Sequence, residues 1–370
     1  MDLDRRRFLA SLPVYLGVAA GKGHARPDGD GDEEILKLIR PIREKNGLPG
    51  LTAAIARPGK PLRIAAVGLR KDDDPAPFGL GDHVHLGSCT KAMTATMIAT
   101  LVEEGKLGWG STLAEVFADA SIDEGNRGVT LAQLLSHRAG LPANAAWWGL
   151  GAEKSKTDQR RELMRRILGK PPFKKPGSEM WYSNVGFVLA ALMAETVAKT
   201  SWEDLMRDRL FKPLGMTSAG FGAPGTAGKV DQPWGHSRFL GNPVPTQRDN
   251  PPVMGPAGTV HCSMADWAKF AELHLAGARG GQTPILKPKT FAALHTPKPT
   301  EGYVCGWVVT ERDWAAGKAL WHNGSNTYWF CEVWLAPKQD TALLAATNSG
   351  RAAGQGAVDA AVAAMIRIIR

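Results

Sequence analysis

A serine and a lysine three residues apart, Ser88 and Lys91, have the spacing that nucleophilic catalysis can use. The apolar run behind them, Ala92 to Val102, is followed by Gly105, a pattern that predicts a helix over residues 88–104. Residues three apart share a helical face, so the Lys91 ammonium can reach the Ser88 hydroxyl. The open amides of the first turn favour negative charge at the serine oxygen. Ser88 is therefore a candidate nucleophile and Lys91 its candidate base.

The residues around Lys91 favour a depressed pKa for its ammonium. Between residues 83 and 102 it is the only formally charged side chain, apart from any protonated His83 or His85. A desolvated lysine without a counter-charge loses its proton readily, and a neutral amine can accept the serine proton. Ser88 is the only serine with lysine three residues on, but about one such pair is expected by chance. A helix-capping serine followed by a surface lysine is the alternative.

Two later triplets also carry side chains suited to acyl transfer. They are Tyr182-Ser183-Asn184 and, on an expected strand, His322-Asn323-Gly324. Tyr182 is the only one of the four tyrosines with asparagine two residues on. The Gly-x-Ser-x-Gly pattern of α/β-hydrolases surrounds no serine of this chain, which argues against that class of enzyme.

In this order, the serine-lysine motif and the two triplets resemble the penicillin-recognising serine hydrolases. The tyrosine-x-asparagine form of the second motif looks like that of class C β-lactamases, D,D-peptidases and the family's esterases. Other enzymes of the family have a related serine-x-x-lysine set. Similar segments extend the resemblance over nearly the whole chain after residue 25; they are 134–141, 176–178, 213–216 and 257–258.

The resemblance implies a role for each residue. Ser88 would be acylated, Lys91 would help to remove its proton, and Tyr182 would pass a proton to the leaving group and later activate water. Asn184 would orient Lys91 and the acyl group. The backbone amides of Ser88 and Ser325 would hold the oxyanion. His322 and Gly324 would lie along the substrate, and no cofactor or metal is required.

The third motif departs from the pattern of β-lactamases and D,D-peptidases, which usually begin it with lysine. His322 is mostly neutral at pH 7, so it offers a hydrogen bond where lysine offers a fixed charge. We therefore expect an exported esterase or peptidase that prefers esters or amides to carboxylate-bearing substrates. A class C-like β-lactamase or D,D-carboxypeptidase is the alternative. A penicillin-binding or sensing module without turnover is a third.

Elements from both ends of the chain are expected to position these residues. A helix over 33–45 and a hairpin with strands 51–56 and 62–68 begin the chain, whereas strands 304–309, 319–322, 328–335 and 341–347 and a helix over 357–369 end it. This predicts an α/β (α+β) fold with one antiparallel sheet, flanked by helices, from about 33–87 and 258–370. A mostly helical insertion would occupy about 105–257. The resemblance implies a β-lactamase/transpeptidase-like domain over 26–370.

The composition is that of a globular protein. Of the 370 residues, 44% are hydrophobic and 22% are charged, which argues against disorder. The four cysteines lack metal-ligand spacing, so buried free thiols are expected; a Cys305–Cys331 disulfide is the alternative. His83 and His85 alternate on a strand without acidic or cysteine partners at ligand spacing, which argues against zinc.

Residues 1–25 have the pattern of an export signal. Arg5-Arg6-Arg7-Phe8-Leu9 precedes an apolar run that ends near a small-x-small cleavage site at residues 23–25. The run is too short to span a membrane, and an arginine pair followed by x-Phe-Leu is typical of twin-arginine signals. We therefore expect a bacterial periplasmic or secreted protein without a transmembrane span in the mature chain.

A basic segment dominates the charge of the chain. Nine basic and three acidic residues lie between residues 151 and 175, a net charge of +6. A solvated helix face is expected, and attraction to an anionic envelope surface is the alternative. The chain lacks a nucleic-acid-binding module. A small-molecule or peptidoglycan-derived substrate is the expected partner, and the oligomeric state is left open.

Overall fold

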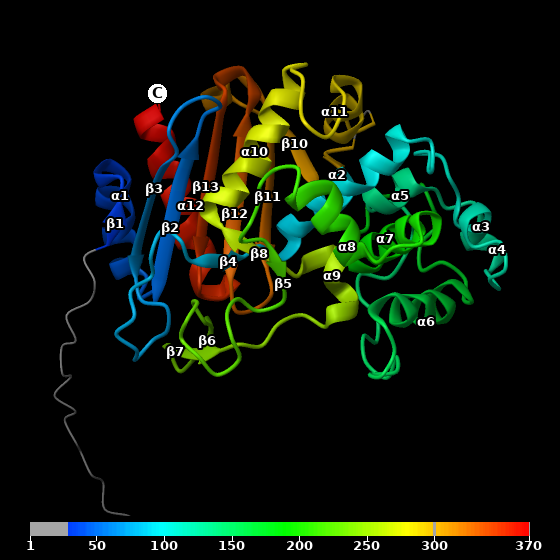
Figure 1. Cartoon of the computed structure of the whole chain (residues 1–370), viewed down its shortest axis with the longest axis horizontal. Coiled ribbons are helices and arrows are strands. Elements are labelled where there is room, and N and C mark those ends of the chain that lie inside the picture. Colours follow the sequence, from blue (N-terminus) through cyan, green and yellow to red (C-terminus); the bar gives the residue numbers. More distant parts are fainter. Residues whose placement is uncertain (1–28, 299–300, 370) are drawn as a thin grey trace, which may run out of the picture.

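An eight-stranded antiparallel sheet forms the centre of the protein (Figure 1). The structure is a computed structural model that describes residues 29–298 and 301–369. The strand order is β1 (Asp30–Gly31), β3 (Arg63–Gly68), β2 (Gly50–Ala56), β13 (Thr341–Thr347), β12 (Phe330–Ala336), β11 (Gly317–Ser325), β10 (Trp307–Arg312) and β9 (Tyr303–Val304). The two chain ends meet where β2 pairs with β13, with Ala54 opposite Leu344. The expected sheet completed by both ends is confirmed.

Helices cover both faces of the sheet. On one face, α1 (Glu33–Lys45) and α12 (Arg351–Ile369) pack against each other and against β2, and α10 (Met264–Ala278) crosses the other face. Asp32 caps α1 by accepting from the amides of Glu34 and Ile35, and Pro41 lies within one continuous helix. By length and composition α12 could span a membrane, and no other helix of the described residues passes that test. It packs against β12 and β13, and seven of its 19 residues are buried.

A mostly helical region lies beside the sheet, at the right of Figure 1. Its elements are α3 (Leu113–Val116), α4 (Glu124–Arg127), α5 (Leu131–Leu135), α6 (Lys156–Leu168), α7 (Asn184–Ala198), α8 (Trp202–Met206) and α9 (Gly255–Gly258). The expected helical insertion also holds a hairpin of β6 (Gly235–Phe239) and β7 (Asn242–Thr246). A small sheet joins β4 (His83–His85), β8 (Val260–Ser263) and β5 (Gly220–Phe221). The remaining helix, α11 (Pro288–His295), packs against α10.

The helix that follows the serine, α2 (Thr90–Glu103), lies between the sheet and the helical region. The expected helix has an apolar run, Ala92 to Val102, and in the structure every residue from Thr90 to Leu101 is buried. Threonines are tolerated there because their hydroxyls bond to backbone carbonyls: Thr94 donates to Pro256 and Thr96 to Ala92. The helix is therefore enclosed on all sides.

The expected strand over 304–309 is wrong, because the chain turns in the middle of it. Cys305 and Gly306 have φ angles of +49° and +86° and connect β9 to β10. A Cβ on Gly306 would lie 2.3 Å from the Ala92 amide nitrogen, so glycine lets this turn touch α2. All four cysteines are buried free thiols, and the sulfur beside Cys331 is that of Cys89, 3.8 Å away. The expected buried free thiols are therefore observed, and the alternative, a Cys305–Cys331 disulfide, is not.

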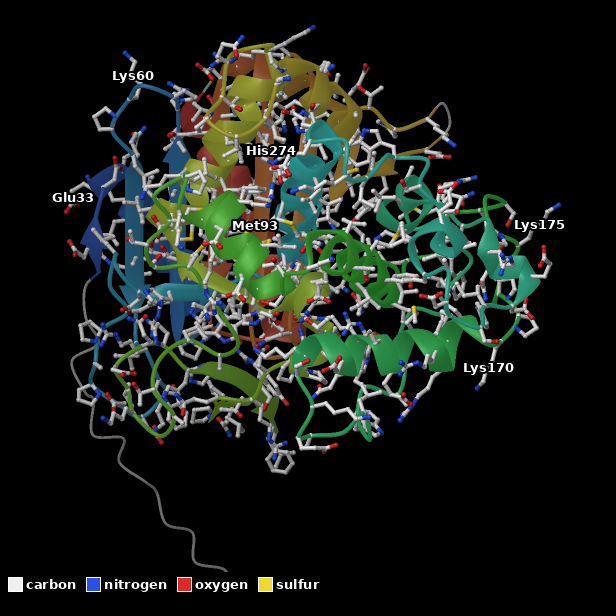
Figure 2. All side chains as sticks on the ribbon, turned by 45° about the vertical axis from the view of Figure 1, so that its right-hand side comes forward. Glu33, Lys60, Met93, Lys170, Lys175 and His274 are labelled. Atoms are coloured by element: carbon white, nitrogen blue, oxygen red, sulfur yellow. The ribbon has the colours of Figure 1, made fainter. Side chains whose placement is uncertain are left out.

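The basic segment is exposed in part. Figure 2 shows Lys170 and Lys175 pointing outward from the helical region. Arg160, on α6, is fully buried and pairs with Glu195 and Glu203 at 2.6 and 2.7 Å. A solvated face therefore describes this helix except at Arg160. The expected export signal, residues 1–25, lies outside the described residues.

Candidate active site

The turn Gly87–Cys89, here called the serine turn, contacts the end of β11 backbone to backbone. Ser88 lies in a 3-10 turn, Gly87–Cys89, that leads into α2. Gly87 has a φ of +47°, and a Cβ there would lie 2.3 Å from the Ser325 amide nitrogen. A Cβ on Gly324 would lie 1.9 Å from the Leu86 carbonyl oxygen and 3.0 Å from the Ser88 amide nitrogen. The two glycines thus permit an approach that brings the amides of Ser88 and Ser325 together.

Lys91 is buried and surrounded by neutral acceptors. Its Nζ lies 3.1 Å from Ser88 Oγ, 2.8 Å from Asn184 Oδ1 and 2.7 Å from the Ala257 carbonyl oxygen. Desolvation lowers the pKa of Lys91 to about 7. A neutral amine has two N–H donors, which suit the amide and the carbonyl, and one lone pair, which then faces the Ser88 hydroxyl. The lysine is placed to accept the serine proton.

Tyr182 reaches the same oxygen from the other side. Its hydroxyl donates to Ser88 Oγ at 2.9 Å. The residue is 37% exposed, but its hydroxyl faces the serine, and desolvation raises the pKa of Tyr182 above its ordinary value. The phenol therefore stays protonated at neutral pH. The His137 ring packs against the Tyr182 ring, with centroids 4.2 Å apart, and supports its orientation.

The start of α7 fixes Asn184. Ser183 caps the helix, because its Oγ accepts from the Gly186 amide and donates to the Pro142 carbonyl. The Asn184 Oδ1 accepts from Lys91, and its Nδ2 donates to Asn144 Oδ1 at 2.9 Å. Asn144 was not singled out in the sequence, since it lies in a loop without a motif of its own.

His322 lines the site, but both of its ring nitrogens already have partners. Its Nδ1 bonds to the Asn323 carbonyl, and its Nε2 lies 3.2 Å from the Tyr303 hydroxyl. Burial lowers the pKa of His322 to about 3, so the ring is neutral. The expectation that His322 offers a free hydrogen bond to the substrate therefore differs from the structure. Tyr303, a second residue that sequence reasoning missed, takes that bond.

A cavity of about 350 Å³ opens at the serine. Its walls include four predicted site residues, Ser88, Tyr182, His322 and Ser325, and Asn323 from the third motif. The other lining residues had no sequence signal; they are Met180, Tyr303, Val308, Trp321, Phe330 and Arg351. Arg351, the first residue of α12, brings a cation to a largely apolar wall, and its Nε donates to Gln355 Oε1. The cavity is suited to an acyl group with an apolar part next to the nucleophile.

The histidines of β4 have neighbours that the sequence did not indicate. The His85 Nε2 lies 2.9 Å from Asp249 Oδ1, and the His83 ring stacks on His261 at 5.5 Å. Among residues 29–298 and 301–369, no group of three or more histidine, cysteine or acidic side chains is arranged to hold a metal ion.

The chain is similar to several known proteins. It is 25% identical to penicillin-binding protein 4 of Amycolatopsis lactamdurans over 84% of this chain and 83% of that protein. It is 23% identical to the unguisins hydrolase ungD' of Aspergillus campestris over 86% of this chain and 62% of that protein. It is also 23% identical to protein flp of Staphylococcus aureus, over 87% of this chain and 64% of that protein. The chain thus spans less than two thirds of the length of the last two relatives.

Solved structures show the same fold. SurE matches with a TM-score of 0.75 and 23% identity over 90% of this chain and 75% of SurE. The D-amino acid amidase of Ochrobactrum anthropi SV3 matches with a TM-score of 0.72 and 21% identity, over 91% of this chain and all of that chain. The family model described as Beta-lactamase matches residues 35–366. This protein therefore belongs to the β-lactamase family.

Proposed function

We propose that this protein is a serine hydrolase that transfers the acyl group of an ester, amide or β-lactam to Ser88 and then to water. The observation that supports it is the network in which Lys91 Nζ and the Tyr182 hydroxyl both lie within 3.1 Å of Ser88 Oγ. A neutral base and a protonated acid on one nucleophile can move a proton in either direction.

Acylation would proceed in two steps. As Ser88 Oγ bonds to the carbonyl carbon, its proton passes to Lys91, and the amides of Ser88 and Ser325 stabilise the oxyanion. The bond to the leaving group then breaks, and that group takes a proton from Tyr182, which Lys91 replaces. In deacylation, water adds to the acyl carbon and loses its proton to the same pair. The ester bond to Ser88 then breaks, and Oγ regains its proton.

We further propose that neutral esters and amides are better substrates than carboxylate-bearing ones. The neutral, engaged His322 and the apolar cavity wall support this preference. The alternative, a class C-like β-lactamase or a D,D-carboxypeptidase, is favoured by Arg351 in the cavity wall and by the similarity to a protein named penicillin-binding protein 4.

Covalent labelling and turnover test the activity. The folded protein is treated with a fluorophosphonate and, separately, with a penicillin, and its intact mass is measured. One adduct on Ser88, absent in Ser88→Ala, is expected with at least one reagent. Linear release of p-nitrophenol from an ester would show turnover, whereas a single burst without further product would favour the binding or sensing module. Label that persists in Ser88→Ala would refute Ser88 as the nucleophile.

We also propose export through the twin-arginine pathway, from the arginine pair of residues 5 and 6 and the apolar run after it. Cell fractionation of the full-length protein and of an Arg5→Lys, Arg6→Lys variant tests this. The wild-type protein is expected outside the cytoplasm and the variant inside it. Equal distribution of the two would contradict the proposal.

A further inference from the structure

A largely buried aspartate, Asp249, has a side chain that is 10% exposed and contacts both His85, just before the turn that carries Ser88, and Asn326, just after Ser325. It belongs to the extended segment after β7, and neither the motifs nor the mechanism above uses it. Its Oδ1 lies 2.9 Å from His85 Nε2, accepts from Asn326 Nδ2 at 2.8 Å, and accepts from the Asn250 amide at 2.7 Å. One oxygen thus connects β4, the loop after β11 and its own segment.

The first connection leads to the serine turn. His85 is fully buried, and its Nδ1 accepts from the Gly87 amide at 3.1 Å. Because Nδ1 accepts, the ring N–H lies on Nε2, which is the nitrogen that faces Asp249. The carboxylate therefore fixes the tautomer that holds the peptide just before Ser88.

The second connection leads to Ser325. Asn326 is 4% exposed, and its Oδ1 accepts from the amides of Tyr328 and Trp329, which closes the turn between β11 and β12. Its Nδ2 is held by Asp249. Asn326, which follows Ser325, is thus held by Asp249 directly. Gly87, which precedes Ser88, is held by the same carboxylate through His85.

A third connection reaches the base. The Asn250 Nδ2 donates to the Gly258 carbonyl at 2.8 Å, next to Ala257, whose carbonyl accepts from Lys91. Burial opposes ionisation of Asp249, but His85, Asn326 and the Asn250 amide together keep its pKa below the ordinary value. The carboxylate is therefore charged and fixed at neutral pH.

We propose that Asp249 is a positioning residue, which sets the spacing of the Ser88 and Ser325 amides through His85 and Asn326. The inference rests on the proposed function, since it assigns those amides to the oxyanion. A carboxylate can accept from several donors at once, whereas an amide oxygen at the same place carries no charge and its nitrogen would oppose donors. Small displacements of oxyanion donors slow the chemical step more than they weaken substrate binding.

The test compares Asp249→Asn with Asp82→Asn. Asp82 is 3% exposed and pairs with Arg70 at 2.7 Å, and its hydrogen bonds go to Arg70 and the Gly79 amide rather than to His85 or Asn326. For each protein we would measure kcat and KM for a p-nitrophenyl ester, the inhibition constant of phenylboronic acid, the burst titre of active sites and the melting temperature. Phenylboronic acid is used because it forms a tetrahedral adduct on an active serine.

For Asp249→Asn, kcat is expected to fall about tenfold or more with a small change in KM. The boronate inhibition constant should rise by a similar factor, at an unchanged burst titre per folded protein. Asp82→Asn should lower the melting temperature without moving the inhibition constant. If Asp249→Asn yields too little folded protein, Asn326→Ala breaks the same link from its other side and is measured in the same way.

Several outcomes would overturn the proposal. If Asp249→Asn has the kinetics and the boronate affinity of the wild-type protein, the proposal is refuted. It is also refuted if the variant loses activity only because fewer active sites are present, that is, with a lower burst titre and an unchanged inhibition constant. If the wild-type protein neither hydrolyses the ester nor binds the boronate, the proposed function fails first, and the positioning role fails with it.

Discussion

Lys91 Nζ lies 3.1 Å from Ser88 Oγ, and its two other contacts are the neutral oxygens of Asn184 and Ala257. Burial without a carboxylate contact makes the charged amine costly, and the pKa of Lys91 falls to about 7. The same enclosure raises the pKa of Tyr182. The two pKa shifts have opposite directions. The lowered pKa leaves Lys91 able to accept a proton, and the raised pKa keeps Tyr182 protonated and able to donate one.

The pH dependence of kcat/KM should follow from the lysine. Because Lys91 is neutral above its pKa, activity is expected to rise as the pH increases through about 7 and to fall below it. The measurement is a pH profile with a neutral ester between pH 5 and 10. A limb that appears only near pH 10, close to the free value of about 10.4, would show that burial does not tune the lysine.

Removal of the tyrosine hydroxyl should separate catalysis from stability. Tyr182→Phe is expected to reduce kcat by about 10²- to 10⁴-fold, because the leaving group loses its proton donor. The aromatic ring remains in Tyr182→Phe, and the residue is 37% exposed, so we expect only a small change in melting temperature. Steady-state kinetics and a thermal melt check both values. Equal kcat in the variant and the wild-type protein would remove Tyr182 from the mechanism.

Arg351 and residue 322 should set the preference for carboxylate-bearing substrates. Arg351→Gln is expected to lower kcat/KM for a cephalosporin and to leave a neutral ester nearly unchanged, since Arg351 lines the cavity. His322→Lys should shift the ratio toward the cephalosporin, because a charge-assisted hydrogen bond contributes about 1.5–3 kcal/mol. The ratio of kcat/KM for the two substrates is measured in all three proteins. Efficient cephalosporin hydrolysis by the wild-type protein would favour the β-lactamase assignment.

The buried ion pairs of Arg160 should be needed for stability. Arg160→Ala leaves the buried Glu195 without its cation and Glu203 with only the half-exposed Lys156, 3.7 Å away. It is expected to lower the free energy of unfolding by about 3–5 kcal/mol. Arg161→Ala is the matched control, because Arg161 is on the same helix, 46% exposed, and pairs with Asp158. Its effect should stay within about 0.5 kcal/mol. Urea unfolding measures both, and equal losses would contradict the burial argument.

A buried carboxyl should make stability depend on pH. Burial, and then the neighbouring Asp359, raise the pKa of Glu332 to about 7. The folded state therefore binds this proton more tightly than the unfolded chain, and the stabilisation present below pH 4.5 is lost as the pH rises through 7. Glu332→Gln should stabilise the protein by about 1–3 kcal/mol at pH 8 and have little effect at pH 4. Unfolding curves at both pH values decide this.

Features that depend on neighbouring residues in the sequence could be predicted. The strand Thr341–Thr347 was predicted with its observed bounds, because a continuous apolar run lies between turn residues. Ser88 and Lys91 are close because a helical turn relates residues three apart. The break between β9 and β10 had no local signal, since Gly306 is required by its contact with α2, more than 200 residues earlier. The apolar pattern of 304–309 therefore predicted one strand, whereas the structure has two, β9 and β10.

Residues that act across the fold could not be found in this way. Asn144, Tyr303 and Asp249 reach the site through contacts with residues 19 to 164 positions away. Their spacing follows from the packing of separate elements, so a motif cannot record it. The same applies to the engagement of His322, whose type was visible in the sequence but whose bond to Tyr303 was not.

The enclosure of α2 has a consequence for laboratory evolution of this protein. Substitutions along residues 90–101 meet protein on every side, so a library built there would mainly sample misfolded chains. The cavity wall is different, because Met180, Val308 and Arg351 come from a loop, a strand and the start of a helix, and none of them is fully buried. Selectivity can therefore be redesigned from these three positions while the reacting atoms keep their places.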